Sequence, residues 1–380
     1  MRKRKILFIT GSRGEYGYIR PILNLIKSSS ELEYEIVGTN MHLLPEFGDS
    51  IEEFKKDNFE VKYQPLMTLS GYTPASMVKS LSVFGLSLPD IFSTAKPDII
   101  LLAGDRGEQL MAAIAGAHMN IPVAHIQAGE LSGNIDGLSR HAIARFTHIH
   151  FAANKDAELR LIRSGEQDFR VFNVGAPQLD EFISGKITSE IELKYKYRGI
   201  DNGFILFVQH SVTEQHERAY EQVKLTLNVL QKTGHSVIAI LPNSDAGSAS
   251  VIRAFEENSF VNLHAHRNVP REDYAGFLKH ALCLVGNSSS GLLEAPTFKL
   301  PAVNIGRRQE GRCQGSNIIN CGHNFDDIYD SISRATSKEF KNTLINIENP
   351  YGDGRSSERI VRIMSSIEIN DKLLQKELAF

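Results

Sequence analysis

The sequence shows no marked excess of charge of either sign and contains few cysteines. It carries 42 basic and 45 acidic residues, a net charge of -3, and no basic block exceeds the opening MRKRK. Proteins that bind nucleic acid carry a basic patch or stripe, so this balance argues against nucleic acid as a partner. The 3 cysteines, Cys283, Cys313 and Cys321, lack CxxC spacing. We interpret them as inert thiols of a reducing compartment.

Long apolar runs are also missing. No run approaches the roughly 20 residues that a membrane-spanning helix requires. The segment ILFIT, which follows the basic pentapeptide, is too short for the core of a signal peptide. There is no repeat or low-complexity tract, and no set of His, Cys and Asp residues has the spacing of a metal site. We therefore expect a cytoplasmic protein with no membrane contact, no metal and no cofactor.

Short apolar runs alternate with amphipathic segments along the 380 residues. One series of expected strands comprises residues 5–10, 34–39, 98–104, 121–126, 148–153 and 170–175, and a second comprises residues 204–209, 235–241, 260–265, 281–286 and 301–306. Runs that are apolar throughout indicate parallel strands covered by helices on both faces. The chain is also too long for one ordinary core. We predict an α/β protein of two Rossmann-like, doubly wound domains facing a central cleft, with residues 1–178 as the first domain, residues 179–355 as the second and a hinge at about 178–203.

A glycine-rich turn follows the first expected strand. The sequence ITGSRGEYG places Arg13 and Tyr16 among glycines between a strand and a helix. Such a turn suits an anion, because backbone N–H groups and the helix dipole point at it. Its spacing is GxxGxxG, so it is neither a dinucleotide-binding fingerprint nor a Walker loop. Arg13 is a candidate clamp for a phosphate or carboxylate, and a surface salt bridge is the alternative.

Acidic residues gather at the next two strand ends of the first domain. LLAGDRGE brings Asp105 and Arg106 to one loop. HIQAGELSGNID brings Gln127, Glu130 and Asp136 to another. Several carboxylates around one cleft can transfer protons, because crowding and burial raise some of their pKa values toward neutrality. The alternative is that these acids cap helices or lie in solvent, and Asp105 stands where a helix cap is common.

The second domain contributes basic, amide and hydroxyl groups. His210 follows its first expected strand and is the histidine best placed to face the cleft, with a packed histidine as the alternative. LPNSDAGS ends the next strand with Asn243 and Asp245, and PAVNIGRRQEGR ends another with Arg308. Arginine in such a position can bind an anion.

Three consecutive serines stand at what we predict to be a helix N-terminus. The stretch GNSSSGLLE contains Ser288, Ser289, Ser290 and Gly291, with Glu294 behind them. One serine would be enough to cap a helix. Several hydroxyls, together with backbone N–H groups and the helix dipole, could hold a diphosphate. Glu294 would repel phosphate but could accept hydrogen bonds from a ribose.

These loops together resemble those of the UDP-N-acetylglucosamine 2-epimerase family, and the closer likeness is to its hydrolysing branch in sialic-acid and legionaminic-acid-type biosynthesis. The motifs that carry the resemblance are TGSRGEYG, GDRGE, HIQAGELSGNIDGLSRHAI, QHSVTEQ, PNSDAGS, GNSSSGLLEAP, NIGRRQEGR and NPYGDGRSSERI. They run in order from residue 10 to about residue 360. The resemblance implies a glycosyltransferase-B-like fold with a nucleotide in the cleft, a terminal helix within 356–380 that packs back on the N-terminal domain, and a homodimer or homotetramer.

The resemblance also implies a reaction and a set of roles. A UDP-2-acetamido sugar, either UDP-N-acetylglucosamine or UDP-2,4-diacetamido-2,4,6-trideoxyglucose, would lose UDP by anti elimination, and the resulting glycal would take up water to give the free manno sugar. Asp105, Glu130 and Asp136 would be the acid/base set, with His210 as a further catalytic group. Other residues would bind the substrate: Arg13 and Arg106 near the phosphates or the sugar, His210, Ser288, Ser289 and Arg308 at the diphosphate, and Glu294 at the ribose. We also predict that the substrate or its UDP part contacts Tyr16, Gln127, Asn243, Asp245, Ser290 and Gly291.

One position departs from the pattern of the family. Many members have a glutamate, an expected catalytic group, where HIQAGE has Gln127. Because an amide does not exchange a proton at neutral pH, we predict that Glu130 takes this role. Three alternatives for the whole chain stay open at this point: a non-hydrolysing 2-epimerase, a UDP-sugar glycosyltransferase of the same fold, and an inactive nucleotide-sugar sensor.

Overall fold

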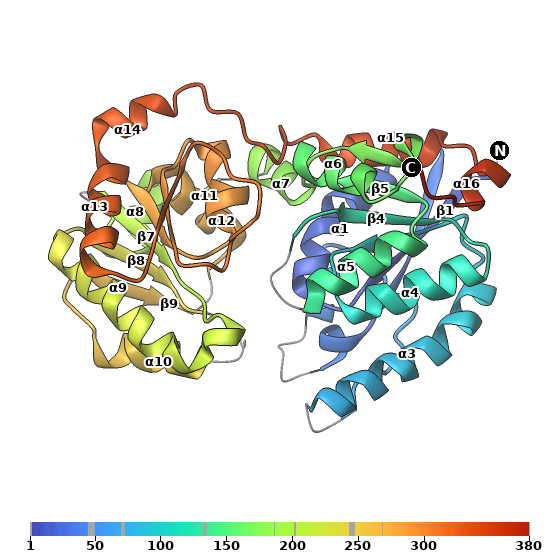
Figure 1. Ribbon diagram of the computed structural model, residues 1–380, viewed down its shortest axis with the longest axis horizontal. Helices are drawn as coiled ribbons and strands as arrows, with labels where there is room; N and C mark the ends of the chain where they lie inside the picture. Colours follow the sequence, from blue (N-terminus) through green and yellow to red (C-terminus); the bar gives the residue numbers. More distant parts are fainter. Residues whose placement is uncertain are drawn as a thin grey trace. The chain divides into compact units, whose positions relative to one another are not determined.

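The chain divides into two compact units, each built on its own sheet (Figure 1). The computed structural model describes residues 2–44, 50–69, 73–131, 135–185, 187–200, 203–242, 248–267 and 269–379. Unit 1 consists of Met1–Glu181 and Tyr351–Phe380, and unit 2 consists of Phe182–Pro350. Each unit holds a six-stranded sheet whose described strand pairs are all parallel. The predicted fold class of two Rossmann-like α/β domains is confirmed.

Unit 1 has the strand order β2-β1-β3-β4-β5-β6. Its strands are β1 (Arg4–Thr10), β2 (Leu32–Gly38), β3 (Ile99–Ala103), β4 (Val123–Ala128), β5 (Ile149–Ala152) and β6 (Val171–Asn173). Its helices are α1 (Arg13–Lys27), α2 (Ile51–Lys56), α3 (Pro74–Ala95), α4 (Gly107–His118), α5 (Ile135–Phe146), α6 (Lys155–Arg163), α15 (Ser356–Ser366), α16 (Asp371–Leu374) and the short 3-10 helices η1 (Asn40–Leu43) and η3 (Asp168–Arg170). The order of the sheet reverses between β1 and β3, where a doubly wound sheet binds its ligand.

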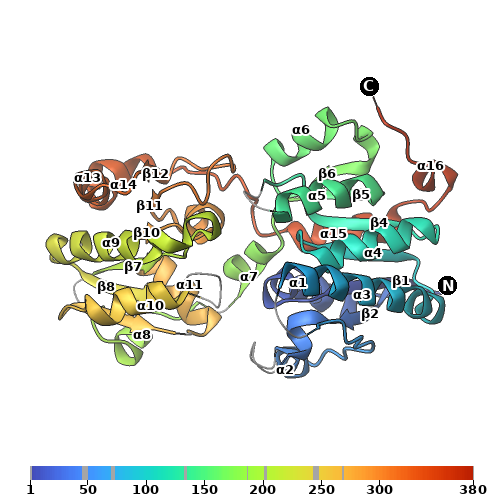
Figure 2. The same cartoon turned by 60° about the horizontal axis from the view of Figure 1, so that its bottom comes forward.

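The strands of unit 1 are buried on both faces because successive side chains of a strand point to opposite sides. In β1, Ile6 and Phe8 belong to the core cluster that α1 and α15 cover. Leu7 and Ile9 belong to the opposite cluster, which α3, α4 and α5 cover. Figure 2 shows the helices on the two sides of this sheet. Continuous apolar runs such as KILFIT therefore predicted this arrangement correctly.

Unit 2 has the strand order β12-β11-β10-β7-β8-β9, which reverses between β7 and β10. Its strands are β7 (Phe204–Val208), β8 (Ser236–Ile240), β9 (Leu263–His266), β10 (Cys283–Gly286), β11 (Ala302–Ile305) and β12 (Ile318–Cys321). Its helices are α8 (Glu190–Lys196), α9 (Ala219–Thr233), α10 (Ser248–Glu257), α11 (Arg271–His280), α12 (Ser290–Leu293), α13 (Phe325–Thr336), α14 (Lys338–Thr343) and the 3-10 helices η4 (Thr213–Arg218) and η5 (Ala295–Phe298). Strand β12 was not predicted, because Asn320 is exposed at the sheet edge and the strand has no continuous apolar run.

The polar segment at 178–203, which we predicted to be a hinge, contains two helices. Helix α7 (Gln178–Ser184) includes the boundary between the units. Helix α8 begins with a capping box, in which Ser189 accepts from the backbone of Glu192 and the Glu192 side chain accepts from the backbone of Ser189. Its Leu193 is buried in the core of unit 2. The polar composition of α8 thus reflects a surface helix with one buried side chain.

Helix α3 is the longest helix of unit 1, with 22 residues. It begins with Thr73 and Ser76, which form a capping box. Met77, Val78 and Leu86 on this helix are 61%, 65% and 80% exposed. Among the helices of the described ranges, neither α3 nor any other combines the length and the apolar character that crossing a bilayer would take.

Candidate functional site

The turn between β1 and α1 is built around Gly11. Ser12 is the N-cap of α1, and its hydroxyl accepts from the backbone N–H of Glu15 at 3.4 Å. Arg13, the first residue of the helix, is exposed and forms an ion pair with Glu53 at 3.0 Å. The salt bridge that we considered as the alternative for Arg13 is therefore present. Because such an exposed pair is weak, Arg13 can exchange this partner for an anionic ligand at little cost.

Tyr16 lies inside unit 1. It is 2% exposed, and its ring packs on Phe54 with the ring centroids 3.8 Å apart. Its hydroxyl donates to Asp57 at 2.6 Å. The structure therefore gives Tyr16 a packing role, and a contact between Tyr16 and substrate stays a prediction.

The turn between β3 and α4 brings Asp105 to the side chain of Arg140 from α5. Arg140 donates to the Asp105 carboxylate and, at 2.7 Å, to the backbone carbonyl of Gln127. The N-cap of α4 is Arg106, so Asp105 is not the helix cap that we weighed as its alternative role. One buried arginine thus ties the ends of β3 and β4 together and holds Asp105 in place.

Gln127 adopts a backbone conformation that non-glycine residues rarely take. Its φ is 61°, and the register of β4 against β5 shifts at this position. Its side chain is buried and donates to Gln178 at 3.3 Å. His125, which we predicted to be a packed histidine, is fully buried and contacts the Gly104 carbonyl at 2.5 Å. Burial lowers the pKa of His125 to about 3, which makes it a neutral part of the fold.

Glu130 is 3% exposed and accepts a hydrogen bond from the side-chain amide of Asn154. Asn154 is the N-cap of α6, where its side-chain oxygen accepts from the Ala157 N–H at 2.8 Å. The carboxylate that we predicted to replace the missing glutamate is therefore held in place by a helix-capping residue.

Three other predicted residues cannot be placed in the same detail. Asp136 lies in the first turn of α5, but its side chain is outside the described part. Asn243 and Asp245 lie outside the described residues altogether.

Asn287 organises the turns of unit 2. Its side chain accepts from the His210 N–H at 2.7 Å and donates to the His210 carbonyl at 2.8 Å. Its own carbonyl accepts from Arg308 at 3.2 Å and from Gln309 at 2.9 Å. Gly286 is required before it, because φ is +132° and a Cβ would lie 2.1 Å from the Val208 carbonyl oxygen. Asn287 thereby joins the ends of β7, β10 and β11, which include the point where the sheet order reverses.

The helix N-terminus that we predicted is present at Ser289 and Ser290, but the helix that it opens is short. Helix α12 has only 4 residues, and the 3-10 helix η5 follows it. Pro296 explains the early end, because proline lacks the N–H that the next helical bond needs and disfavours the helical conformation of the residue before it. Ser289 is the N-cap of α12 but its side chain makes no capping bond. With so short a helix the dipole contributes little, so hydroxyls and side chains carry any anion binding here.

The serine hydroxyls face Tyr274 and Glu294 instead. Ser290 and Ser288 lie close enough to the Tyr274 hydroxyl to oppose the rise that burial gives its pKa, and Ser290 acts in the same way on Glu294. Burial, opposed by Ser290 and the charges of Arg271 and Arg312, raises the pKa of Glu294. Among the described residues, no partner reaches its buried Oε2 atom. A buried carboxylate oxygen without a partner is costly, so this site is suited to a ligand that donates hydrogen bonds, such as a sugar hydroxyl.

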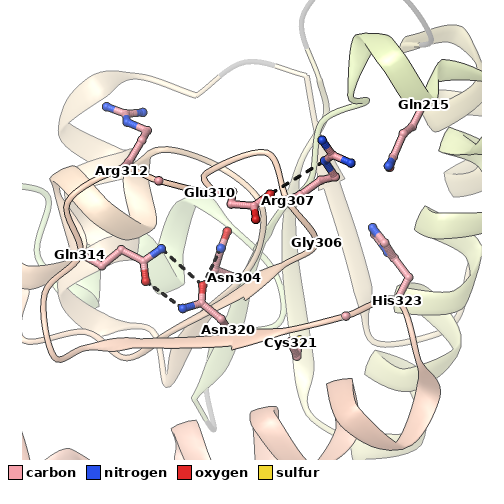
Figure 3. A pocket seen from close by; sticks show the side chains of 12 residues that line it. Gln215, Asn304, Gly306, Arg307, Glu310, Arg312, Gln314, Asn320, Cys321 and His323 are labelled. Carbon is pink, nitrogen blue, oxygen red and sulfur yellow. Dashed lines mark hydrogen bonds and ion pairs between the residues drawn. The ribbon is translucent and has the colours of Figure 1, made fainter. Parts of the chain in front are cut away.

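A polar cavity of about 630 Å³ lies beyond the ends of β11 and β12 (Figure 3). Asn320 exchanges hydrogen bonds with Gln314 and accepts one from Asn304 at 2.8 Å. Gln215 and His323 lie on its other side. The described residues that line it include Arg307 and Arg312 of the NIGRRQEGR motif, but none of the residues to which we assigned a catalytic or substrate-binding role.

Four residues make contacts in the turns at the strand ends but were not among the predicted site residues. They are Asn287, Tyr274, Glu15 and Glu108. Asn287 and Glu108 stand beside chosen residues in GNSSS and GDRGE, so their position at strand ends was a usable signal. Tyr274 comes from α11, and no local pattern indicates that its hydroxyl meets the serines.

The comparisons with known proteins agree with this architecture. Two parallel-sheet units give the chain a glycosyltransferase-B-like fold. The crystal structure of UDP-GlcNAc 2-epimerase from Neisseria meningitidis bound to UDP-GlcNAc superimposes with a TM-score of 0.79 at 20% identity, covering 95% of this chain and 99% of that one.

Sequence similarity identifies the family. The model of the UDP-N-acetylglucosamine 2-epimerase family matches residues 24–365. A UDP-N,N'-diacetylbacillosamine 2-epimerase (hydrolyzing) from Legionella pneumophila is 34% identical over 377 residues, 98% of each chain. A GDP/UDP-N,N'-diacetylbacillosamine 2-epimerase (hydrolyzing) from Campylobacter jejuni is 32% identical over 352 residues, 90% of each chain. The chain therefore belongs to the UDP-N-acetylglucosamine 2-epimerase family, as its motifs indicated.

Proposed function

We propose that this protein is a hydrolysing UDP-sugar 2-epimerase that feeds nonulosonic acid biosynthesis. The observation that carries the proposal is its similarity, along 98% of the chain, to a relative named as a hydrolysing diacetylbacillosamine 2-epimerase. The substrate is a UDP-2-acetamido sugar of the gluco series, UDP-N-acetylglucosamine or UDP-2,4-diacetamido-2,4,6-trideoxyglucose. A base removes the C2 proton, the C1–O bond breaks to release UDP, and water then adds its hydroxyl to C1 and a proton to C2.

In this proposal unit 2 holds the leaving group. Arg308, His210 and the serine hydroxyls stabilise the negative charge that grows on the diphosphate as the C1–O bond breaks. The contacts of Asn287 with Arg308 and His210 support this role, because they hold both residues at the sheet reversal. The Oε2 atom of Glu294, which has no partner among the described residues, accepts from the ribose.

Unit 1 supplies the proton transfers. Asp105, held by Arg140, and Glu130, held by Asn154, act with Asp136 as the acids and bases of elimination and hydration. Arg13 and Arg106 bind the phosphates or the sugar. The amide of Gln127 cannot exchange a proton, so Glu130 carries the role of the glutamate that other members have there.

The experiment is an assay of UDP release with each candidate sugar nucleotide, on the wild type and on Glu130→Gln. The amide oxygen of the new side chain can still accept from Asn154, so the fold is kept while the exchangeable proton is lost. We expect kcat to fall by about 100-fold or more, as for loss of a general acid or base. Unchanged kcat in Glu130→Gln would exclude this residue, and no UDP release by the wild type from either substrate would refute the proposed activity.

We also propose a homodimer or homotetramer located in the cytoplasm. The exposed apolar side chains of α3, Met77, Val78 and Leu86, support association, since large apolar patches on a protein surface mark interfaces. The absence of a disulfide among the three cysteines fits a reducing compartment. Light scattering coupled to size exclusion tests the assembly: Val78→Lys with Leu86→Lys should lower the measured mass, and a wild type that elutes as a monomer would contradict it.

A further inference from the structure

Two buried glutamates approach each other around Gly11. Glu15 accepts from the Gly11 N–H at 2.5 Å. Glu108 lies against the same residue, so that a Cβ at Gly11 would be 2.1 Å from its Oε1 atom. Glu15 is 3% exposed and Glu108 is 2% exposed. Glycine is therefore needed at position 11, because any side chain would displace the second carboxylate.

The carboxylate of Glu15 accepts few hydrogen bonds. Its Oε2 has the Gly11 N–H, whereas its buried Oε1 has no hydrogen-bond partner among the described residues. Burial first, and then the charge of Glu108, raise the pKa of Glu15 well above its ordinary value, and Arg106 opposes them. Two adjacent carboxylates out of water cannot both be ionised without a large cost, so the protonated form of one is favoured.

The carboxylate of Glu108, in contrast, accepts hydrogen bonds from two side chains. Its Oε1 accepts from the Arg106 guanidinium Nε at 3.1 Å and from the Asn40 side-chain amide at 3.1 Å. Of the two, Glu108 is thus the one whose negative charge is compensated. The same contact fixes Arg106, which is one-third exposed at the end of β3.

We propose that Glu15 and Glu108 form a buried carboxylic acid–carboxylate pair that shares one proton, and that the charged Glu108 positions Arg106 for the substrate. The second part rests on the proposed function, in which Arg106 binds the phosphates or the sugar. Glu108 acts as the positioning residue, and Glu15 is its buried partner in the pair. The negative charge of the pair also compensates the charge of Arg106.

The groups that surround the pair do not supply another proton near neutral pH. The charges that act on Glu15 are those of Glu108 and Arg106. Gln109, which is uncharged, donates to the backbone carbonyl of Ile9 at 3.2 Å. His42, from η1, contacts Thr10 at 2.9 Å, and burial with the charge of Arg13 lowers its pKa to about 4. Among these groups, Glu15 is the one whose pKa is raised, by burial and by the charge of Glu108.

The first part is tested by thermal unfolding between pH 5 and pH 8.5 for the wild type, Glu15→Gln and the exposed control Glu31→Gln. The folded protein resists ionisation of Glu15, so the wild type loses stability as the pH rises from the ordinary to the raised pKa. Glutamine imitates the protonated form and removes this loss. We expect Glu15→Gln to gain about 2 °C or more over the wild type at the upper end, with a smaller gain at pH 5. A difference that does not change with pH, or that changes equally in Glu31→Gln, would overturn proton sharing.

The second part is tested by the Kd for UDP-N-acetylglucosamine, which requires no turnover. Glu108→Gln should raise Kd about tenfold, because it releases Arg106, whereas Glu15→Gln should stay within about threefold of the wild type. Glu108→Asp, which keeps the charge, should recover part of the affinity. Equal Kd values for the wild type and Glu108→Gln would overturn the positioning of Arg106. If the wild type binds the nucleotide sugar without releasing UDP, the proposed function fails while both parts of this inference are still decided.

Discussion

At the scale of single residues, a substitution of Ser289 distinguishes a role of its hydroxyl in nucleotide binding from a role in capping the helix. It stands at the N-cap of α12 without a capping bond, so its hydroxyl contributes little to stability. We expect Ser289→Ala to change the free energy of unfolding by less than about 0.5 kcal/mol and to weaken UDP binding about tenfold. Denaturant unfolding and calorimetric titration with UDP measure the two effects.

The matched control for this prediction is Ser337→Ala. Ser337 does cap a helix, since it accepts from the Phe340 N–H at 3.2 Å. Its loss should cost about 1 kcal/mol of stability and leave UDP affinity unchanged. Equal UDP affinity of wild type and Ser289→Ala would mean that this serine has no part in the nucleotide site.

Glu294 gives a second prediction at this scale. If its Oε2 atom accepts from the ribose, the wild type should prefer UDP over its 2′-deoxy analogue, and Glu294→Gln should reduce that preference about tenfold. Burial raises the pKa of Glu294, so the charged acceptor, and with it the preference, is lost as the pH falls through the raised pKa. Competition binding of UDP and 2′-deoxy-UDP at two pH values measures the preference and its dependence on pH. The exposed Glu310→Gln is the control. If Glu294→Gln showed the same preference as the wild type, a contact between Glu294 and the ribose would be excluded.

At the scale of elements, the C-terminal segment depends on one buried arginine. Arg170 is fully buried and donates to the carbonyls of Lys372, Leu373 and Gln375 at 2.8, 2.5 and 2.9 Å. Glu166 nearby is ion-paired with Lys376 at 2.6 Å. These contacts, with the packing of α15 on α1, hold residues 351–379 in unit 1.

We therefore expect Arg170→Ala to release the terminal segment. Removing a charged donor from three carbonyls should cost about 3 kcal/mol, whereas the exposed Arg163→Ala should cost less than about 0.5 kcal/mol. Denaturant unfolding measures the loss, and limited proteolysis followed by mass spectrometry should show earlier cleavage after residue 366. An unchanged cleavage pattern would show that α15 and α16 do not depend on Arg170.

At the scale of elements, the sequence predicted part of the fold and part of the candidate site. Apolar runs and glycine turns located the described strands of both sheets except β12, because burial and backbone conformation leave local patterns. They did not reveal that Asn287 joins three strand ends or that Glu15 meets Glu108, since these contacts connect residues far apart in the chain. The serines indicated where α12 begins, but its early end was not predicted, because Pro296 was not considered.

At the scale of the whole molecule, the central claim is that the chain releases a free sugar. Hydrolysing and non-hydrolysing family members share a fold, so the product decides between them. The direct measurement is NMR of the products formed in D₂O from UDP-N-acetylglucosamine and from its 2,4-diacetamido-2,4,6-trideoxy analogue. Our account predicts UDP and a free manno sugar with deuterium at C2, because the proton that returns to C2 comes from solvent. Recovery of an intact UDP-manno sugar, or of a free sugar that keeps the gluco configuration, would contradict it.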